Sequence, residues 1–177
     1  MELLTVGHGT QAAETFATRV TGAGVALVVD IRRFPGSRRH PQFGQAELAR
    51  WLPELDVAYR WEERLGGRRT GLPHSPNGGL RNAAFRAYAD YMASSAFRGA
   101  LDDLLRAADQ VDCAVICAES LWWRCHRRLV ADAATLLHGV AVRHLMPDGR
   151  EQPHTPTPGA VVEGGSVRYP PPQVSLL

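Results

Sequence analysis

The chain has 177 residues, 45% of them hydrophobic, which favours one domain with a full core and argues against a disordered chain. The formal net charge is +2, and all 20 basic residues are arginine, a bias that a GC-rich genome explains. No apolar run reaches the roughly 18 residues of a transmembrane helix, and the N-terminus lacks the basic segment of a signal peptide. We therefore expect no membrane partner. The three cysteines are an odd number, which favours reduced thiols and a cytoplasmic location.

The first third of the chain predicts two buried strands around a helix. Residues 3–6 have the pattern of a short buried strand, which the turn at residues 7–10 ends. Residues 11–21 show helical spacing of their apolar positions. Residues 25–31 are apolar on both faces until Asp30, which is typical of a central strand in a parallel sheet.

Two loops surround the next helix and strand. Residues 32–44 form a loop rich in Arg, Pro and Gly, and residues 45–54 predict a short helix. A third strand follows at residues 57–61. The long segment 62–81 is too polar for a core, so we expect it to be a loop that covers a site.

The next part of the chain returns to alternating helices and strands. Residues 83–108 predict a helix in two pieces, broken near Ser94-Ser95. Residues 113–118 predict the fourth strand, residues 122–138 a helix and residues 140–146 the fifth strand. We expect residues 1–146 to form a single α/β domain.

The C-terminal segment is rich in proline and glycine. We expect residues 147–177 to be an extended tail, packed on the domain or extending from it, with one hairpin around Gly164-Gly165.

Strands that alternate with helices predict an α/β fold of three layers, in which helices cover both faces of a mostly parallel, Rossmann-like, five-stranded sheet. In such sheets ligands bind beyond the carboxyl ends of the strands. The segments that follow the first four strands are residues 7–10, 32–44, 62–81 and 119–123. We expect them to meet at one edge of the sheet.

These segments carry much of the positive charge. Residues 31–45, 62–81 and 119–128 hold eleven arginines and three carboxylates, a formal charge of +8, so the rest of the chain carries −6. Such a field attracts anions, and arginine fits phosphate with two hydrogen bonds. We therefore predict an anionic, phosphate-bearing ligand, either a nucleotide or a nucleic acid. The alternative is that these arginines pair with surface acids. The ligand-binding candidates are Gly7, Asp30, Arg32, Arg124, Arg127 and Trp122.

Some of these candidates have alternative roles. Gly7 allows the backbone to approach a ligand closely. Asp30 either accepts a hydrogen bond from a ribose hydroxyl or orients a guanidinium by ion pairing. Trp122 either stacks on a base or packs in the core.

The catalytic candidates are His8, Glu119, Cys125 and His126, most of them in the window 115–128. Cys125 lies near a helix N-terminus, where a thiolate is stabilised; it is a nucleophile or a ligand, unless it only packs. Glu119 and His126 are the acid–base candidates, although Glu119 is equally suited to hold an arginine. His8 titrates near neutral pH or caps a turn.

A metal site is not predicted. Cys117, Cys125, His126 and His8 would be its ligands, but no pair has the short Cys-x-x-Cys spacing of structural zinc sites. The sequence identifies no cofactor.

Several different short motifs follow one another along the chain in a characteristic order. They are residues 6–9 (VGHG), 29–32 (VDIR) with Pro35 and Ser37, 41–43 (PQF), 65–67 (LGG), 85–92 (FRAYADYM), 117–119 (CAE) and 125–127 (CHR). This order, over about residues 3–146, resembles the DUF488 family of domains of unknown function. The family more often carries a serine where this chain has Gly9-Thr10. The resemblance implies an α/β domain and no established activity.

Three functional hypotheses therefore rest on the residues themselves. The first is an enzyme that acts on a phosphate-bearing substrate. The second is a non-catalytic module that binds a nucleotide or nucleic acid with the same arginines. The third is a metal or redox site built on Cys117, Cys125 and His126.

Overall fold

A computed structural model describes residues 1–36 and 38–172 of the chain. Ser37 and the end of the expected tail, residues 173–177, lie outside the described residues. The described part forms a six-stranded sheet of order β3-β2-β4-β1-β5-β6 and a two-stranded hairpin. The strands are β1 (Glu2–Gly7), β2 (Leu27–Asp30), β3 (Ala58–Trp61), β4 (Cys113–Cys117), β5 (Ala141–Leu145), β6 (Glu151–Pro153), β7 (Val161–Glu163) and β8 (Ser166–Arg168).

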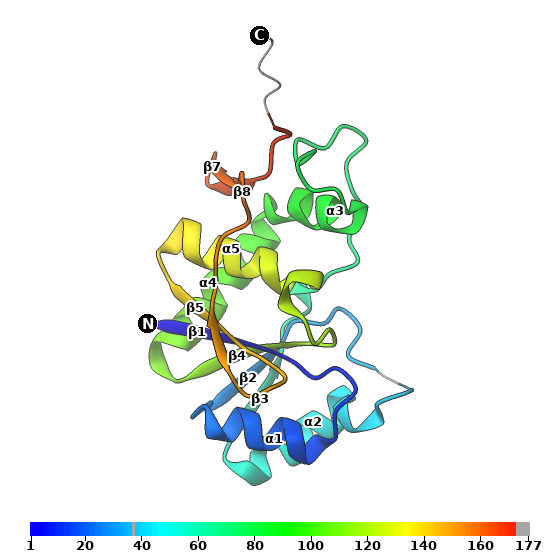
Figure 1. Ribbon diagram of the computed structural model, residues 1–177, viewed down its shortest axis with the longest axis vertical. Coiled ribbons are helices and arrows are strands. Elements are labelled where there is room, and N and C mark those ends of the chain that lie inside the picture. Colours follow the sequence, from blue (N-terminus) through cyan, green and yellow to red (C-terminus); the bar gives the residue numbers. More distant parts are fainter. Residues whose placement is uncertain (37, 173–177) are drawn as a thin grey trace.

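The predicted α/β architecture is confirmed. Strands β1 to β5 pair in parallel, and helices cover both faces of the sheet, with α1 and α2 on one side and α3, α4 and α5 on the other (Figure 1). The helices are α1 (Ala13–Gly22), α2 (Gln45–Trp51), α3 (Ala83–Met92), α4 (Ser95–Gln110) and α5 (Arg127–His138). Short 3-10 turns are η1 (Pro41–Phe43), η2 (Pro53–Leu55), η3 (Glu63–Leu65) and η4 (Trp122–Arg124).

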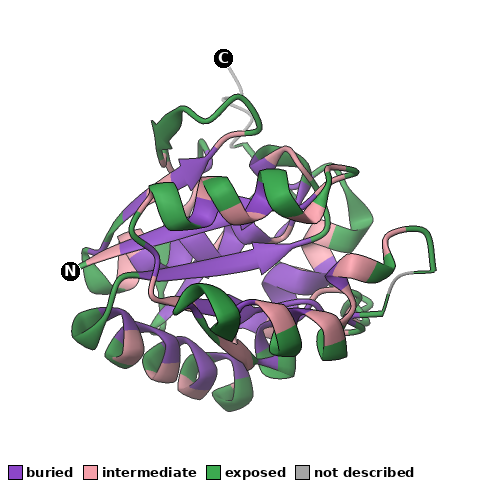
Figure 2. Cartoon of the chain, turned by 90° about the horizontal axis from the view of Figure 1, so that it is seen from below, coloured by how far each residue is buried: buried purple, intermediate pink, exposed green. Residues whose placement is uncertain are grey.

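Two hydrophobic clusters lie on opposite faces of the sheet, because alternate residues of each strand point to opposite sides. Leu4 and Ile116 pack against α1 and α2 on one face. Leu3 and Val115 pack against α3, α4 and α5 on the other. Strands β1, β2, β4 and β5 are buried along most of their length, and the helices expose their outer faces (Figure 2). Within the described ranges, no helix is long and apolar enough to cross a bilayer.

The tail contributes more to the fold than the sequence predicts. After β5 the chain reverses at residues 146–150, where Gly149 has a φ of 82°, and returns as the antiparallel edge strand β6. Pro153 is tolerated there because an edge strand leaves one side without ladder hydrogen bonds. The hairpin expected at Gly164-Gly165 is present as β7 and β8, and both glycines have positive φ.

Helix α5 begins later than the predicted residue 122. Residues Trp122–Arg124 form a 3-10 turn, and Cys125 has an extended backbone before the helix starts at Arg127. The predicted break near Ser94 is present, since the Ser94 hydroxyl accepts a hydrogen bond from the Phe97 amide and caps α4.

The strand order fixes where a site can lie. Strand β4 lies between β2 and β1, with Gly7 opposite Cys117 and Asp30 opposite Ile116. The carboxyl ends of these three strands are therefore neighbours, although their residues are far apart in the sequence.

Candidate functional site

A cleft of about 730 Å³ opens at the carboxyl ends of the central strands. His8 follows β1, Arg32 follows β2, Glu119 follows β4, and His126 precedes α5; all four line the cleft. The convergence expected from a parallel sheet therefore brings these candidates together. Residues of the long segment before α3 complete the wall.

His8 is buried and has both ring nitrogens engaged. Its Nδ1 lies 2.8 Å from the Gly9 carbonyl oxygen, to which it donates, and its Nε2 lies 3.4 Å from Arg32 Nη1. The ring stacks on Phe43 at a centroid distance of 4.4 Å. Burial, with the nearby Arg32 charge, lowers the pKa of His8 from 6.5 to about 4. The imidazole is therefore neutral at pH 7 and supports Arg32.

Asp30 and Arg32 form a buried ion pair at the end of β2. The Asp30 carboxylate accepts from Arg32 Nε at 2.8 Å, from the Arg32 amide at 3.0 Å and from the Tyr59 hydroxyl at 2.8 Å. Burial opposes the charge on Arg32, but the contacts with Asp30 outweigh it and raise the pKa of the guanidinium. Of the two roles considered for Asp30, the structure has the ion pair.

Arg127 lies behind the cleft and supports its floor. Its guanidinium is buried and donates to the carbonyl oxygens of Glu119 and Ser120. Gly7 explains how these segments fit together, because a Cβ atom there would lie 1.9 Å from the Glu119 carbonyl oxygen. Gly7 thus permits close packing of two backbone segments, and Arg127 fixes the turn that carries Glu119.

Two thiols and an imidazole meet on the cleft floor. His126 Nδ1 lies 3.8 Å from Cys117 Sγ and 3.7 Å from Cys125 Sγ. The other ring nitrogen, Nε2, lies 3.0 Å from the carbonyl oxygen of Ile31. A carbonyl oxygen can only accept, so Nε2 carries the proton and Nδ1 presents its lone pair to the thiols.

The pKa values of the two thiols are shifted in opposite directions. The hydrogen bond with Cys125, together with burial, raises the pKa of Cys117 well above its ordinary value. Burial also opposes a charge on Cys125, but the hydrogen bond from Cys117, the neighbouring His126 and the charge of Arg127 outweigh it and hold the pKa of Cys125 well below its ordinary value. The Arg127 amide, 3.5 Å from Cys125 Sγ, adds a donor at the start of α5. Cys125 is therefore the more acidic thiol of the pair.

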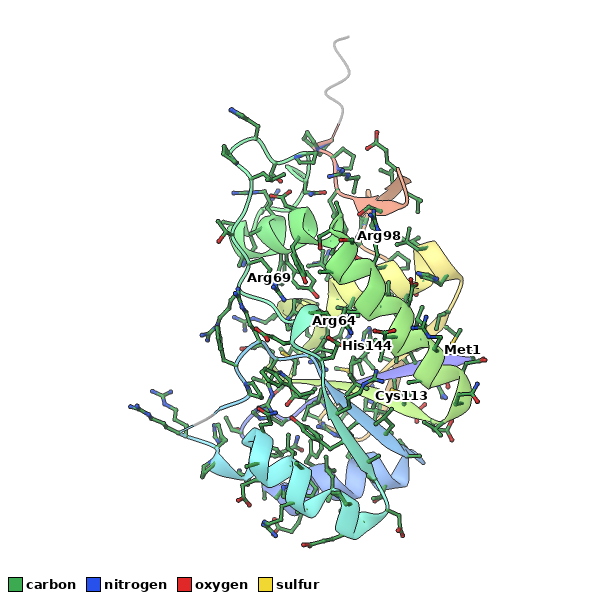
Figure 3. The ribbon with its side chains drawn as sticks, turned by 180° about the vertical axis from the view of Figure 1, so that it is seen from behind. Met1, Arg64, Arg69, Arg98, Cys113 and His144 are labelled. Atoms are coloured by element: carbon green, nitrogen blue, oxygen red, sulfur yellow. The ribbon has the colours of Figure 1, made fainter. Side chains whose placement is uncertain are left out.

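The positive charge that lines the cleft is smaller than the formal charge of +8 counted from the sequence. Arg64 pairs with Glu62 and Asp103, and Arg69 lies 3.8 Å above the Tyr91 ring, on the segment between β3 and α3 (Figure 3). Those guanidiniums are engaged within the protein. The arginines that line the cleft without a carboxylate partner among the described residues are Arg33, Arg68 and Arg124. Glu119 is the one carboxylate among the lining residues, and its side chain is exposed.

Trp122 lies outside the cleft lining. Its ring stacks on His144 at a centroid distance of 4.1 Å, and its Nε1 donates to the side chain of Gln152 in β6. Of the two roles considered for Trp122, the structure has the packing role.

Sequence reasoning missed the part played by residues 66–68. A Cβ at Gly66 would lie 2.7 Å from the Arg33 backbone, and one at Gly67 would lie 3.2 Å from His126 Nδ1. Arg68, next to them, has a φ of 56°, which is uncommon for a residue with a side chain. The adjacent glycines were the available signal, because they allow this loop to press onto Arg33 and His126.

A series of buried hydrogen bonds connects Arg127, behind the cleft, to the C-terminal segment. Arg127 Nη1 approaches Thr5 Oγ1 at 3.5 Å, and Thr5 Oγ1 lies 2.7 Å from His144 Nδ1. His144 Nε2 lies 3.0 Å from His154 Nδ1, and His154 Nε2 lies 2.9 Å from Asp132 Oδ1. His144 lies near the centre of the molecule (Figure 3). The cleft floor and the C-terminal segment therefore share one polar network.

The chain matches the family model described as "Domain of unknown function DUF488" over residues 12–134. No curated protein and no solved structure shows a significant match. The match covers more than half of the chain, and it includes the turn that carries Glu119 and both cysteines of the cleft floor.

Proposed function

The chain belongs to the DUF488 family, and from the geometry of its cleft we propose that it is an enzyme acting on a phosphate-bearing substrate, a nucleotide or a nucleic acid. The observation that carries the proposal is the set of three arginines that form no ion pair within residues 1–36 and 38–172 and that surround a single exposed carboxylate. The family description names no activity, so the argument rests on this arrangement.

The dimensions and charge of the cleft support an anionic ligand. Its volume of about 730 Å³ lies within the range of roughly 300–1,000 Å³ that small-molecule sites occupy. Arg33, Arg68 and Arg124 give it three positive charges against the one negative charge of Glu119. Guanidiniums bind both phosphate and carboxylate oxygens with two parallel hydrogen bonds, and three guanidiniums suit the larger negative charge of a phosphate group.

Each polar group has a role that its surroundings suit. Arg68 and Arg124 are exposed at the cleft and bind the phosphate. Arg32, held by Asp30 and His8, presents a fixed positive charge deeper in the cleft. Glu119 is the acid–base group, because its carboxylate has no hydrogen bond among the described residues and faces the same space. Cys125 and His126 lie on the floor beneath it.

The test is a screen followed by a turnover assay. Nucleotides and short oligonucleotides are first ranked by the shift that they cause in Tm, because a ligand that binds only the folded state raises it. Conversion of the ranked compounds is then followed by mass spectrometry. The variant Glu119→Gln should retain binding and lose turnover by a factor of about 100 or more. Glu163→Gln, which changes another exposed glutamate in β7, is the control.

A non-catalytic binding module remains the second candidate, because the same arginines serve it equally well. It predicts ligand binding without conversion, and equal behaviour of Glu119→Gln and Glu163→Gln. If no compound of either class shifts Tm and none is converted, both readings of the cleft are wrong.

A further inference from the structure

The cluster on the cleft floor has the dimensions of a metal site. The donor atoms of Cys117, Cys125 and His126 all lie within 4.8 Å of one another. Tetrahedral zinc with Zn–S bonds of about 2.3 Å and Zn–N bonds of about 2.0–2.1 Å requires S···N separations of roughly 3.6 Å. The observed separations are 3.8 Å and 3.7 Å. The same geometry requires an S···S separation of about 3.8 Å, and the two sulfurs lie within 4.8 Å of each other, so a shift of at most about 1 Å places one ion at bonding distance from all three atoms.

The imidazole is already oriented as a ligand. Its Nε2 donates to the Ile31 carbonyl oxygen at 3.0 Å, which fixes the tautomer that leaves Nδ1 free to coordinate. Histidines that bind metals almost always donate their second nitrogen in this way. The same hydrogen bond anchors the ring with Nδ1 at 3.8 Å from Cys117 Sγ and 3.7 Å from Cys125 Sγ.

We propose that Cys117, Cys125 and His126 bind a zinc ion, with the fourth coordination position open to the cleft. In the described part of the chain, three side chains and no fourth one contribute to the cluster. Sites with three protein ligands are typical of catalytic zinc, whereas structural sites have four. All three residues line the cleft, so the fourth position faces the space that Arg68 and Arg124 surround.

The chemical consequence is a second way to bind the substrate. An open zinc position takes water or an anionic oxygen, and here it lies beside guanidiniums that attract the same anions. In this arrangement Cys125 is a ligand rather than a nucleophile. The inference does not rest on the proposed function, because zinc binding can be measured without any substrate.

The experiment measures zinc on the full-length chain. The reduced protein is analysed for metal content by mass spectrometry, and its zinc affinity is determined by competition with a chromophoric chelator. Cys117→Ser, Cys125→Ser and His126→Gln each remove one ligand. Cys113→Ser is the matched control, because Cys113 is a buried cysteine of the same strand, β4, outside the cluster.

We expect one zinc per chain in the wild type and in Cys113→Ser. Loss of a single ligand should weaken binding more than about 100-fold, since even the loss of a supporting hydrogen bond costs 10–100-fold. Cobalt substituted for zinc should show the intense sulfur-to-metal absorption of thiolate ligands. A reduced wild type that binds zinc no better than Cys117→Ser, or a cobalt form without that absorption, overturns the proposal.

A second measurement covers variants that fail to fold. In the wild type, zinc should slow alkylation of both Cys117 and Cys125, located by peptide mass spectrometry, with Cys113 as the internal reference. Equal rates of alkylation of Cys117 and Cys125 with and without zinc contradict the site. The site is also contradicted if these two cysteines are found as a disulfide and the protein, once reduced, binds no zinc. Zinc binding without any nucleotide binding would refute the proposed function alone.

Discussion

Asp132 anchors the C-terminal segment to α5, and its replacement by alanine should destabilise the whole chain. Its carboxylate is fully buried and accepts four hydrogen bonds. Two come from Thr157, through its amide at 2.9 Å and its hydroxyl at 2.6 Å. The others come from His154 at 2.9 Å and from the Tyr169 hydroxyl at 2.8 Å. All three donor residues belong to the segment after β5.

The magnitude follows from the donors that Asp132→Ala leaves without an acceptor. The Thr157 amide and His154 Nε2 can only donate in this arrangement, and a buried unsatisfied donor costs about 1–3 kcal/mol. Removal of one member of a buried charged network typically costs about 3–5 kcal/mol, so we expect a loss in that range. This is a large part of the roughly 5–15 kcal/mol that stabilises a domain. Asp132→Asn keeps one acceptor oxygen and should lose less.

The assay is urea unfolding followed by tryptophan fluorescence, with Trp122 on His144 as a probe close to the network. Asp102→Ala is the control, because Asp102 is 51% exposed and its carboxylate lies 3.9 Å from His138 Nε2. That variant should change the free energy of unfolding by less than about 1 kcal/mol. Equal stabilities of the two alanine variants would refute the anchoring role of Asp132.

Two further predictions concern stability. Burial, with the nearby His154 and Arg127, lowers the pKa of His144 from 6.5 to about 3. The unfolded chain therefore binds a proton first, and the free energy of unfolding should fall by about 1 kcal/mol per pH unit as the pH drops below 6.5. His144→Gln should flatten this slope in urea titrations, and an unchanged slope would assign it to other groups. Gly7→Ala should cost more than about 2 kcal/mol, because its Cβ would meet a carbonyl oxygen at 1.9 Å. Thermal melts of both glycine variants measure this effect. Gly22→Ala should be neutral, because nothing lies within 4 Å of its added Cβ. Equal Tm values of Gly7→Ala and Gly22→Ala would contradict the packing argument.

The sheet was predictable because its strands carry a local signal. Residues 25–31 and 113–118 are continuous apolar runs, which suit strands covered on both faces, and both form interior strands of the sheet. Gly164-Gly165 was an equally local signal, because a two-residue hairpin turn requires positive φ at both positions. The family resemblance is likewise confirmed by the match over residues 12–134.

The remaining features depend on contacts that sequence spacing does not encode. Strand β6 exists because residues 151–153 reach the free edge of β5, and nothing in their composition indicates a strand. The arginines looked alike in the sequence, yet Arg127 became a buried support and Arg124 stayed exposed. The thiol and imidazole cluster forms because a 3-10 turn folds Cys125 back beside the end of β4. The sequence offered these three residues as one hypothesis, but their spacing matches no metal motif and does not predict that they meet.

The salt dependence of ligand affinity tests the central claim most directly, because it reports the charges that the cleft supplies. The tightest nucleotide or oligonucleotide from the screen is titrated at low and high salt against the wild type, Arg124→Ala and Arg98→Ala. Arg98 is an exposed arginine of α4 outside the cleft lining (Figure 3). We predict that affinity falls as salt rises, and that Arg124→Ala binds about tenfold more weakly, which corresponds to about 1.4 kcal/mol, while Arg98→Ala binds as the wild type does. Salt-independent binding, or equal affinities of the two variants, would contradict an anion site in this cleft.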